Sequence, residues 1–163
     1  MNCQFETTNC RQCVKRQCAE VCTKPKYQIE TRLQFTIKAD ADTICCILRA
    51  IAAEGINLNA QSICAIDPCK SVLRIVPGQD NCQADFVIKC VKSILTKFNV
   101  CFSIEEVVKV YILREHVPGV FAQLYCSLNE CLVIYSSYST EYGDIIFEVD
   151  SVAKAIRIIS RLR

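Results

Sequence analysis

Residues 111–134 read YILREHVPGVFAQLYCSLNECLVI, and the order of elements in this stretch decides the fold class. The apolar run 107–113 leads into it and predicts a strand. A helix is predicted over 118–128, because proline suits the first turn of a helix and apolar residues then recur at helical spacing. Residues 131–138 predict the next strand. The stretch is therefore a strand, a turn, a helix and a returning strand.

The sequence on both sides of this stretch extends the same order of elements. After it, the pattern predicts a strand over 144–149 and a helix over 151–162. Before it, the predicted elements are strands over 29–38, 56–66 and 70–76, and helices over 43–54 and 81–98, the second of which Asn81 is placed to cap. The segment 99–113 is too long for one strand, and it predicts two strands that meet near Glu105-Glu106.

The two halves of the globular region align at an offset of 76 residues. Ile37-Lys38-Ala39-Asp40 matches Leu113-Arg114-Glu115-His116, and Glu54-Gly55-Ile56-Asn57 matches Glu130-Cys131-Leu132-Val133. Such self-similarity indicates a duplication. We expect an α+β fold of two tandem ferredoxin-like βαββαβ units, 27–106 and 107–163.

The second copy ends directly after its second helix, so its last strand is missing from the pattern. A sheet without that strand leaves a row of unpaired backbone N–H and C=O groups. We expect one of three covers for this edge: the other unit, a second chain, or the segment 1–26.

Two stretches resemble the ACT domain family, which shows a strand, an acidic-x-Pro-Gly turn, a helix and then Gly-Ile-Asn. Pro118-Gly119 carries the turn in the second copy, and Gly55-Ile56-Asn57 stands in the first, within AIAAEGINLNAQSI (50–63). The resemblance covers about 27–162. It implies a regulatory module, often paired edge to edge, that binds amino acids or similar small ligands near the turn before the first helix.

The resemblance implies ligand-binding residues in the second copy, namely His116, Pro118 and Gly119. In the first copy, Asp42 and Thr43 stand where the Pro-Gly pair would be at the same offset. A glycine lets a backbone approach a ligand closely, whereas Thr43 is expected to obstruct it.

The segment 1–26 is polar and rich in cysteine, and Lys24-Pro25-Lys26 marks its end. Residues 10–22 read CRQCVKRQCAEVC, in which cysteine and valine recur on one face of a predicted helix. Cysteines four apart in a helix seldom have disulfide geometry with each other. We therefore expect this Cys-rich arm to form disulfides with another subunit, through Cys3, Cys10, Cys13, Cys18 and Cys22.

Two other interpretations of the arm stay open. Cys10, Cys13, Cys18 and Cys22 could together hold zinc or an iron–sulfur cluster, but only Cys10 and Cys13 have the C-x-x-C spacing that such sites use in pairs. The arm could also be a flexible tail with reduced thiols.

The cysteines of the globular region fall into two groups. Cys69, Cys82 and Cys131 lie near predicted turns or element ends, so they are candidates to receive a disulfide from an arm. Cys45, Cys64, Cys90 and Cys126 lie in apolar segments, and we expect them to be buried as small apolar residues.

Composition excludes several classes of function. With 19 Lys+Arg and 17 Asp+Glu the net charge is +2, so nucleic acid is not an expected partner. His116 is the only histidine, and the four glycines are isolated, which disfavours His-based catalysis and phosphate-binding loops. We expect no enzyme activity, no cofactor and no membrane insertion.

These observations predict a non-enzymatic structural subunit that associates with itself, cross-linked through its arm into an oligomer or fibre. The start of the chain lacks the apolar run of a secretory signal, so we expect synthesis in the cytoplasm and later oxidation on an external surface such as a spore layer. One alternative is a tandem ACT sensor of an amino acid or another small-molecule ligand, and a further one is a metal-binding adaptor.

Overall fold

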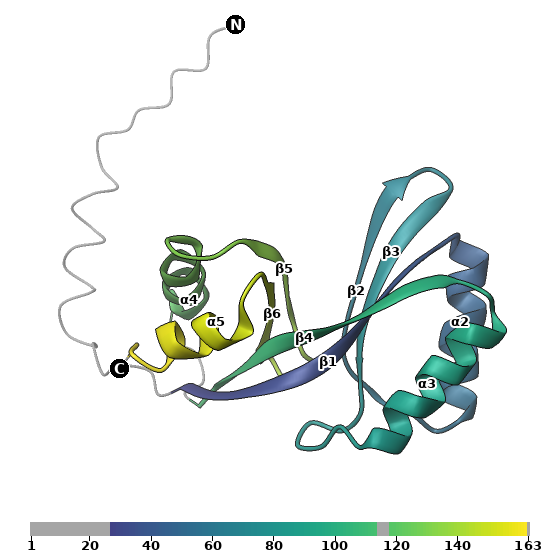
Figure 1. Ribbon diagram of the computed structural model, residues 1–163, viewed down its shortest axis with the longest axis horizontal. Coiled ribbons are helices and arrows are strands. Elements are labelled where there is room, and N and C mark those ends of the chain that lie inside the picture. Colours follow the sequence, from purple (N-terminus) through teal and green to yellow (C-terminus); the bar gives the residue numbers. More distant parts are fainter. Residues whose placement is uncertain (1–26, 114–117, 163) are drawn as a thin grey trace, which may run out of the picture.

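The computed structural model describes residues 27–113 and 118–162, and the arm 1–26 lies outside them. Figure 1 shows an α+β architecture in which helices pack on one antiparallel sheet. In chain order the elements are β1 (Tyr27–Ala39), α2 (Ala41–Ala53), β2 (Leu58–Asp67), β3 (Lys70–Pro77), α3 (Asp85–Lys97), β4 (Cys101–Ile112), α4 (Val120–Asn129), β5 (Ile134–Ser139), β6 (Ile145–Val149) and α5 (Val152–Ile159).

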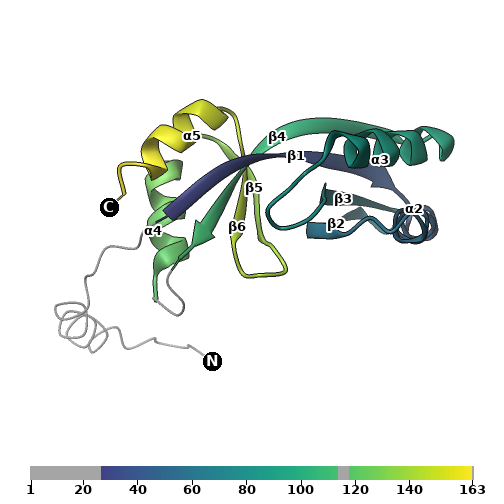
Figure 2. The ribbon, with the colours of Figure 1, turned by 90° about the horizontal axis from the view of Figure 1, so that it is seen from below.

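The longest strands, β1 and β4, pair with each other along the whole molecule. Their antiparallel ladder runs without a register shift from Tyr27 opposite Ile112 to Lys38 opposite Cys101. Figures 1 and 2 both show the two strands side by side through the left and right halves of the molecule. This ladder is the common spine of the structure.

The prediction of two strands meeting near Glu105-Glu106 was wrong, because β4 is a single strand. Glu105 stands opposite Gln34 and Glu106 opposite Leu33, both within the continuous ladder. Two adjacent charged residues do not break a strand when its backbone groups stay paired and their side chains point to opposite faces. The predicted boundary at 106/107 therefore falls inside β4.

The ladder completes both ferredoxin-like units, which confirms the predicted fold class. The strand order is β2-β3-β1-β4-β6-β5. Unit 1 comprises β1, α2, β2, β3, α3 and β4. Unit 2 begins with the same β4, continues through α4, β5, β6 and α5, and takes β1 as its last strand. The edge that the truncated second copy leaves open is thus covered by the other unit.

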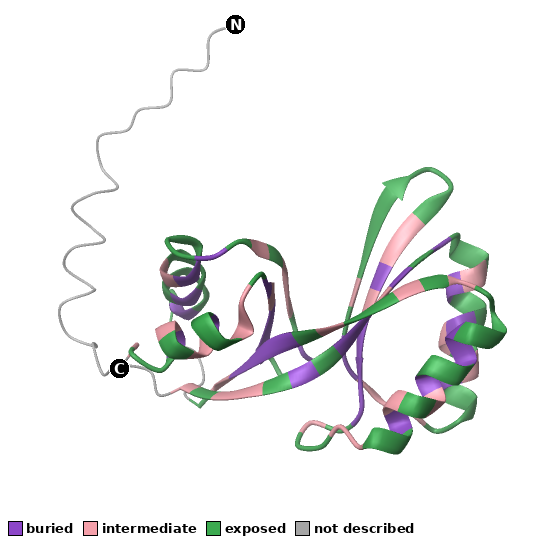
Figure 3. Ribbon diagram, viewed as in Figure 1, coloured by how far each residue is buried: buried purple, intermediate pink, exposed green. Residues whose placement is uncertain are grey.

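One face of the shared strands supplies both helix-covered cores. Phe35 and Ile37 of β1 pack in the core of unit 1 with α2 and α3, and Tyr27 and Ile29 pack against the core of unit 2 with α4 and α5. All four positions are odd-numbered, so they share one face of the strand. Figure 3 shows the buried positions of the helices on the sides that face the sheet.

The face of the sheet that carries no helices is concave between the two units. Ala60 of β2 forms an isolated antiparallel bridge with Thr140, which follows β5. A small third core gathers there, with Val76, Val107 and Ile146 fully buried in it. The sheet is therefore curled, and the two outer hairpins approach each other over its concave side.

The two copies differ in how their first helices begin. The helix ends agree with the offset of 76, since Glu54 ends α2 and Glu130 ends α4. At the starts, however, Asp40 caps α2 and Gly119 stands at the N-cap of α4, so the offset is 119 − 40 = 79. The assignment of Thr43 as the counterpart of Gly119 was therefore wrong, because the link before α4 is longer.

The predicted cap of α3 was also wrong. That helix starts at Asp85 with Ala84 at its N-cap, and Asn81 lies in the loop before it. Among the helices of 27–113 and 118–162, none combines the length and the apolar character needed to cross a membrane.

The borrowed strand gives a test of the architecture. Ile29→Ala is expected to lower the free energy of unfolding by about 1–3 kcal/mol, since it removes half-buried packing atoms from the core of unit 2. Hydrogen exchange should speed up first in β6 and α5 rather than in α2 and α3. The matched control is Ile63→Ala, because Ile63 is 57% exposed. Equal protection changes in both units would contradict the assignment of β1 to unit 2.

Candidate functional site

The predicted cross-linking residues are not brought together by the described part of the chain. The arm cysteines lie outside it. Cys69, Cys82 and Cys131 are exposed, as expected, but they lie on the β2–β3 turn, the loop before α3 and the end of α4. Within the described residues every cysteine is a free thiol.

The prediction that Cys45, Cys64 and Cys126 are buried was wrong, because all three are exposed. Cys45 and Cys126 lie on the outer sides of amphipathic helices, and Cys64 lies on the edge strand β2. Cys90 is half-buried and packs against the core of unit 1. Apolar neighbours in sequence did not determine which side of each element the thiol occupies.

The ligand turn that the ACT resemblance implies lies between β4 and α4. Its His116 is outside the described residues, while Pro118 and Gly119 are exposed. Gly119 adopts φ +88, which favours glycine, and a Cβ at this position would meet no described atom within 4 Å. Among the described residues, none therefore fills the space beside the backbone at the start of α4.

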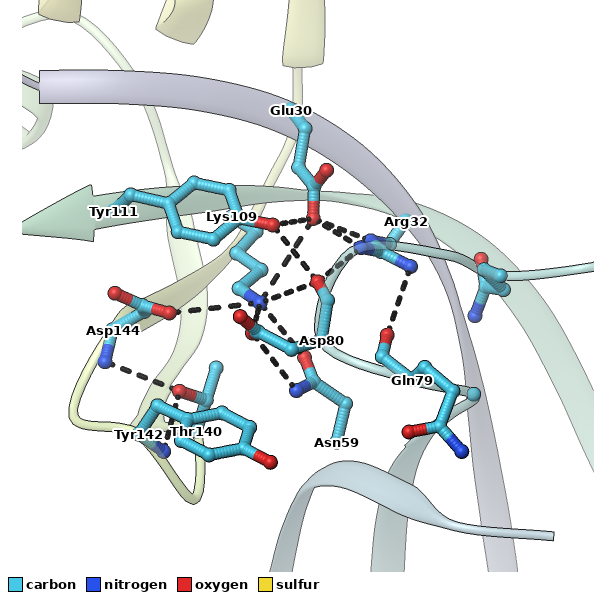
Figure 4. Close-up of polar contacts among 12 residues, drawn as sticks. Glu30, Arg32, Asn59, Gln79, Asp80, Lys109, Tyr111, Thr140, Tyr142 and Asp144 are labelled. Atoms are coloured by element: carbon cyan, nitrogen blue, oxygen red, sulfur yellow. Dashed lines mark hydrogen bonds and ion pairs between the residues drawn. The ribbon is translucent and has the colours of Figure 1, made fainter.

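The buried ammonium group of Lys109 lies three residues before the end of β4. Figure 4 shows the polar side chains that converge on it. The Lys109 side chain is 0% exposed, and its Nζ forms an ion pair with the carboxylate of Asp80. It also donates to Oδ1 of Asn59 at 3.1 Å, and Oδ2 of Asp144 lies 3.6 Å away. The ring of Tyr111 lies beneath it, with 4.3 Å from Nζ to the ring centroid. We call these residues, with Glu30 and Arg32, the Lys109 cluster.

The backbone carbonyl of Asp80 collects three donors in this cluster. Lys109 Nζ donates at 3.1 Å, Arg32 Nη2 at 2.5 Å and the hydroxyl of Tyr111 at 2.9 Å. The loop is shaped for this approach by Gly78, where a Cβ would lie 2.8 Å from the carbonyl oxygen of Cys82. The loop 78–84 is thereby fixed onto β1 and β4.

Gln83 holds the same loop from its other end. Its side-chain amide accepts from Leu33 N at 2.6 Å and donates to Leu33 O at 2.8 Å. It thus pairs with β1 next to the point where β3 stops pairing, at Phe35. The Gln83 side chain thus satisfies the backbone N–H and C=O groups of Leu33, which would otherwise require a neighbouring strand as partner.

The charges of Lys109 and Asp80 each stabilise the ionised form of the other. Burial alone would raise the pKa of Asp80, but its hydrogen bond to Lys109, the Lys109 charge and Asn59 hold that pKa below its usual range. Burial alone would lower the pKa of Lys109, but the hydrogen bonds to Asp80 and Tyr111 raise it above its usual range. Lys109 and Asp80 are therefore charged and paired across the neutral pH range.

The Lys109 cluster joins parts of both units. Asp80 comes from a loop of unit 1, Asp144 from the β5–β6 hairpin of unit 2, and Lys109 from the shared strand. Asp144 also accepts from the backbone N–H of Ile112 at 3.4 Å, at the end of β4. The donors and acceptors of the cluster are already engaged with one another. The cluster therefore serves to position the loop of unit 1, the β5–β6 hairpin and β4 relative to each other.

A second polar group lies on the other side of the third core. The carboxylate of Glu148 accepts from Gln34 at 3.0 Å, from Arg74 Nε at 2.9 Å and from Ser136 at 2.7 Å. Tyr138 donates to the side chain of Gln34 at 2.5 Å, and burial raises the Tyr138 pKa. This group also connects strands of unit 1 with strands of unit 2.

Sequence reasoning missed the Lys109 cluster. The available signal was a lysine inside the apolar run VVKVYI (107–112), where a strand buried on both faces carries a charge. Its partners could not be found in the same way, since Glu30, Asn59 and Asp144 are distant in sequence. As for metal sites, no group of three or more His, Cys, Asp or Glu in 27–113 and 118–162 is arranged as a ligand set.

Comparisons with known proteins agree with this fold. No family model matches the sequence, and no curated protein matches it. Among solved structures, protein BT0572 from Bacteroides thetaiotaomicron has a TM-score of 0.60 at 20% identity, over 82% of this chain and 88% of that one. The regulatory subunit of aspartate kinase from Thermus thermophilus has a TM-score of 0.56 at 13% identity, over 83% and 95%.

A third likeness is to part of a larger protein. E. coli aspartokinase III, in complex with aspartate and ADP, has a TM-score of 0.54 at 11% identity, over 86% of this chain and 33% of that one. At these identities the likenesses establish the fold, which is ACT-like, as the sequence resemblance implied.

Because the Lys109 charge is buried, replacing this residue is expected to destabilise the fold. Lys109→Met is expected to lower the free energy of unfolding by about 3 kcal/mol, at the low end for a broken buried ion pair, because it leaves the largely buried Asp144 and the 38%-exposed Asp80 without their partner. Adding Asp80→Asn in the same chain should recover part of the loss. Urea unfolding measures both, with the exposed Lys92→Met as control. A change in Lys109→Met no larger than in the control would contradict the pairing.

The pKa of Asp80 predicts a pH dependence. Because the folded-state pKa lies below the ordinary value of 3.8, the carboxylate contributes stability that is present above about pH 3.8 and is lost as the pH falls through the folded pKa. Asp80→Asn is expected to flatten this acid limb of the unfolding free energy against pH. An unchanged acid limb in Asp80→Asn would show that other carboxylates carry it.

Proposed function

We propose that this chain is a non-enzymatic regulatory module that senses a small ligand at the turn between β4 and α4. The observation that carries the proposal is the open, glycine-containing start of α4, at Gly119, within an ACT-like fold. The likeness to the Thermus thermophilus regulatory subunit, which extends over 95% of that chain, supports a regulatory role.

The difference between the copies supports placing the ligand in unit 2. In unit 1, Asp40 caps α2 itself, accepting from Thr43 N at 2.9 Å and from the Thr43 hydroxyl at 2.8 Å. These bonds hold the pKa of Asp40 below its usual range. A carboxylate of the protein thus occupies the position where a ligand carboxylate would bind. In unit 2 the N-cap is Gly119, which has no side chain to do so.

The chemistry of a helix start suggests the class of ligand. The first N–H groups of a helix have no intrahelical acceptors, and the helix dipole favours a negative charge beside them. A small molecule with a carboxylate, such as an amino acid, fits this environment. The exposed aromatic ring of Phe121, the second residue of α4, offers an apolar surface beside it.

The response is proposed to pass through the shared strand. A ligand at the turn would bear on the end of β4, where Ile112 is bonded to Asp144, and Asp144 lies against Lys109. Lys109 in turn holds the loop of unit 1 through Asp80. A shift of the turn would therefore alter contacts in both units.

Self-association through the arm stays a second candidate. The exposure of Cys69, Cys82 and Cys131 favours it, because thiols at the surface are accessible to a neighbouring chain. Mapping of the disulfides in protein isolated with its thiols blocked at lysis tests it. Arm cysteines that are all found reduced would rule this role out.

Thermal unfolding in the presence of each of the twenty amino acids tests the sensing function. A ligand at a hundred times its Kd should add about 2.7 kcal/mol to the unfolding free energy. Gly119→Ala is expected to abolish the shift, since its Cβ would occupy the open space and φ +88 disfavours alanine.

The control for this experiment is Gly55→Ala. Gly55 also has a positive φ, +67, and open space around it, but it ends α2 in unit 1. It should lose stability and keep the ligand shift. Absence of any shift with all twenty amino acids would exclude amino acids as the ligand class.

A further inference from the structure

The outer side of α4 is apolar, although the exposed side of a surface helix is normally charged or polar. Phe121, Ala122, Tyr125 and Cys126 are all exposed and lie on one side of the helix, because residues four apart share a face. The rings of Phe121 and Tyr125 are 49% and 39% exposed and lie 5.8 Å apart. No charged residue occurs in Val120–Asn129. We call these four exposed residues the α4 outer face.

The Cys-rich arm joins the described part of the chain beside this helix. Tyr27, the first described residue, pairs with Ile112 at the end of β4. Its hydroxyl donates to Oε1 of Gln123, in the first turn of α4, at 3.1 Å. Figures 1 and 2 both show the start of β1 at the end of the molecule that carries α4 and α5.

The length of the connection keeps the arm close to α4. Residues 23–26 alone separate Tyr27 from Cys22, the last cysteine of the arm. Five fully extended residues span at most about 17 Å. Cys22 therefore stays within reach of the first turn of α4.

The arm is basic, and the part of unit 2 that carries α4 is acidic. The arm has five basic and two acidic residues, so its net charge is 5 − 2 = +3. Residues 118–153 contain no lysine or arginine and five acidic residues. Asp144 and Glu148 are already in ion pairs, whereas Glu130, at the C-cap of α4, is exposed. The charges of the two segments are therefore complementary.

The direction of the chain adds to this complementarity. An arm helix that lies along α4 must run antiparallel to it, because the arm ends beside the first turn of α4. As helices, residues 10–22 and α4 would be about 18 and 14 Å long, so their lengths match. Arg11 and Lys15 then lie near the C-terminal end of α4, where the helix dipole favours cations. Lys154 already donates to Cys131 O there, at 2.6 Å.

We propose that the Cys-rich arm packs antiparallel on the α4 outer face of its own chain. The cysteines and valines that recur on one side of residues 10–22 meet the rings of Phe121 and Tyr125, and sulfur packs favourably against aromatic rings. A short tether gives an effective concentration on the order of millimolar. A contact with a Kd of about 0.1 mM is then formed roughly nine-tenths of the time.

Alkylation of Cys126 by N-ethylmaleimide in the full-length, reduced chain tests the proposal, with mass spectrometry to measure the rate at each thiol. Arg11→Glu combined with Lys15→Glu is expected to raise the rate at Cys126 at least about threefold, and about tenfold if the arm is fully released. The rate at Cys64, an exposed thiol of unit 1, should not change.

Matched variants separate docking from a general effect of charge. Lys89→Glu with Lys92→Glu makes the same charge change on the exposed side of α3 and should leave Cys126 unaffected. Glu130→Lys, added to the arm variant, should restore the protection. Val14→Lys makes the arm more basic but places a charge on its apolar side, and it should release Cys126 as well.

The protection should not depend on protein concentration, because the arm and α4 belong to one chain. Protection that grows with concentration would assign the α4 outer face to a second copy and overturn the proposal. So would a Cys126 rate that neither arm variant changes, or one that charge reversal raises and Val14→Lys does not. These outcomes are independent of ligand binding by unit 2.

Discussion

The ladder between β1 and β4 is the constraint on which the rest of the structure depends. Each strand belongs to two four-stranded units at once, so neither unit has a complete sheet without the other. The N-terminal half of β1 closes the core of unit 2, while its C-terminal half closes that of unit 1. The chain therefore behaves as one cooperative sheet with two helical layers on the same face, rather than as two linked domains.

The buried charge on β4 fixes the register of that ladder. A slip of one residue would turn Lys109 to the face where Val108 and Val110 pack against helices, and an unpaired ammonium there would be costly. In the observed register Lys109 meets Asp80 and Asn59 instead. A buried ion cluster adds little net stability compared with apolar packing, but here it favours one alignment over its neighbours.

The sequence predicted the duplicated architecture because hydrophobic spacing and the Glu54/Glu130 correspondence are local signals. It could not predict the sharing of strands, since a strand that serves two sheets looks like any other in a periodic pattern. The same limit applies to Cys64, whose apolar neighbours suggested burial although β2 is an edge strand. The partners of Lys109 come from four separate segments, and only the folded topology brings them together.

The two copies differ in how the chain passes from the first strand of each unit into its first helix. In unit 1 the helix start is closed by Asp40, and β1 enters α2 through a single residue. In unit 2 the corresponding link is longer and ends at Gly119, next to a strand end that Asp144 ties to Lys109. Under the proposed sensing function, the protein's own carboxylate closes the turn of unit 1, so that one ligand at the turn of unit 2 would act on the strand that both units share.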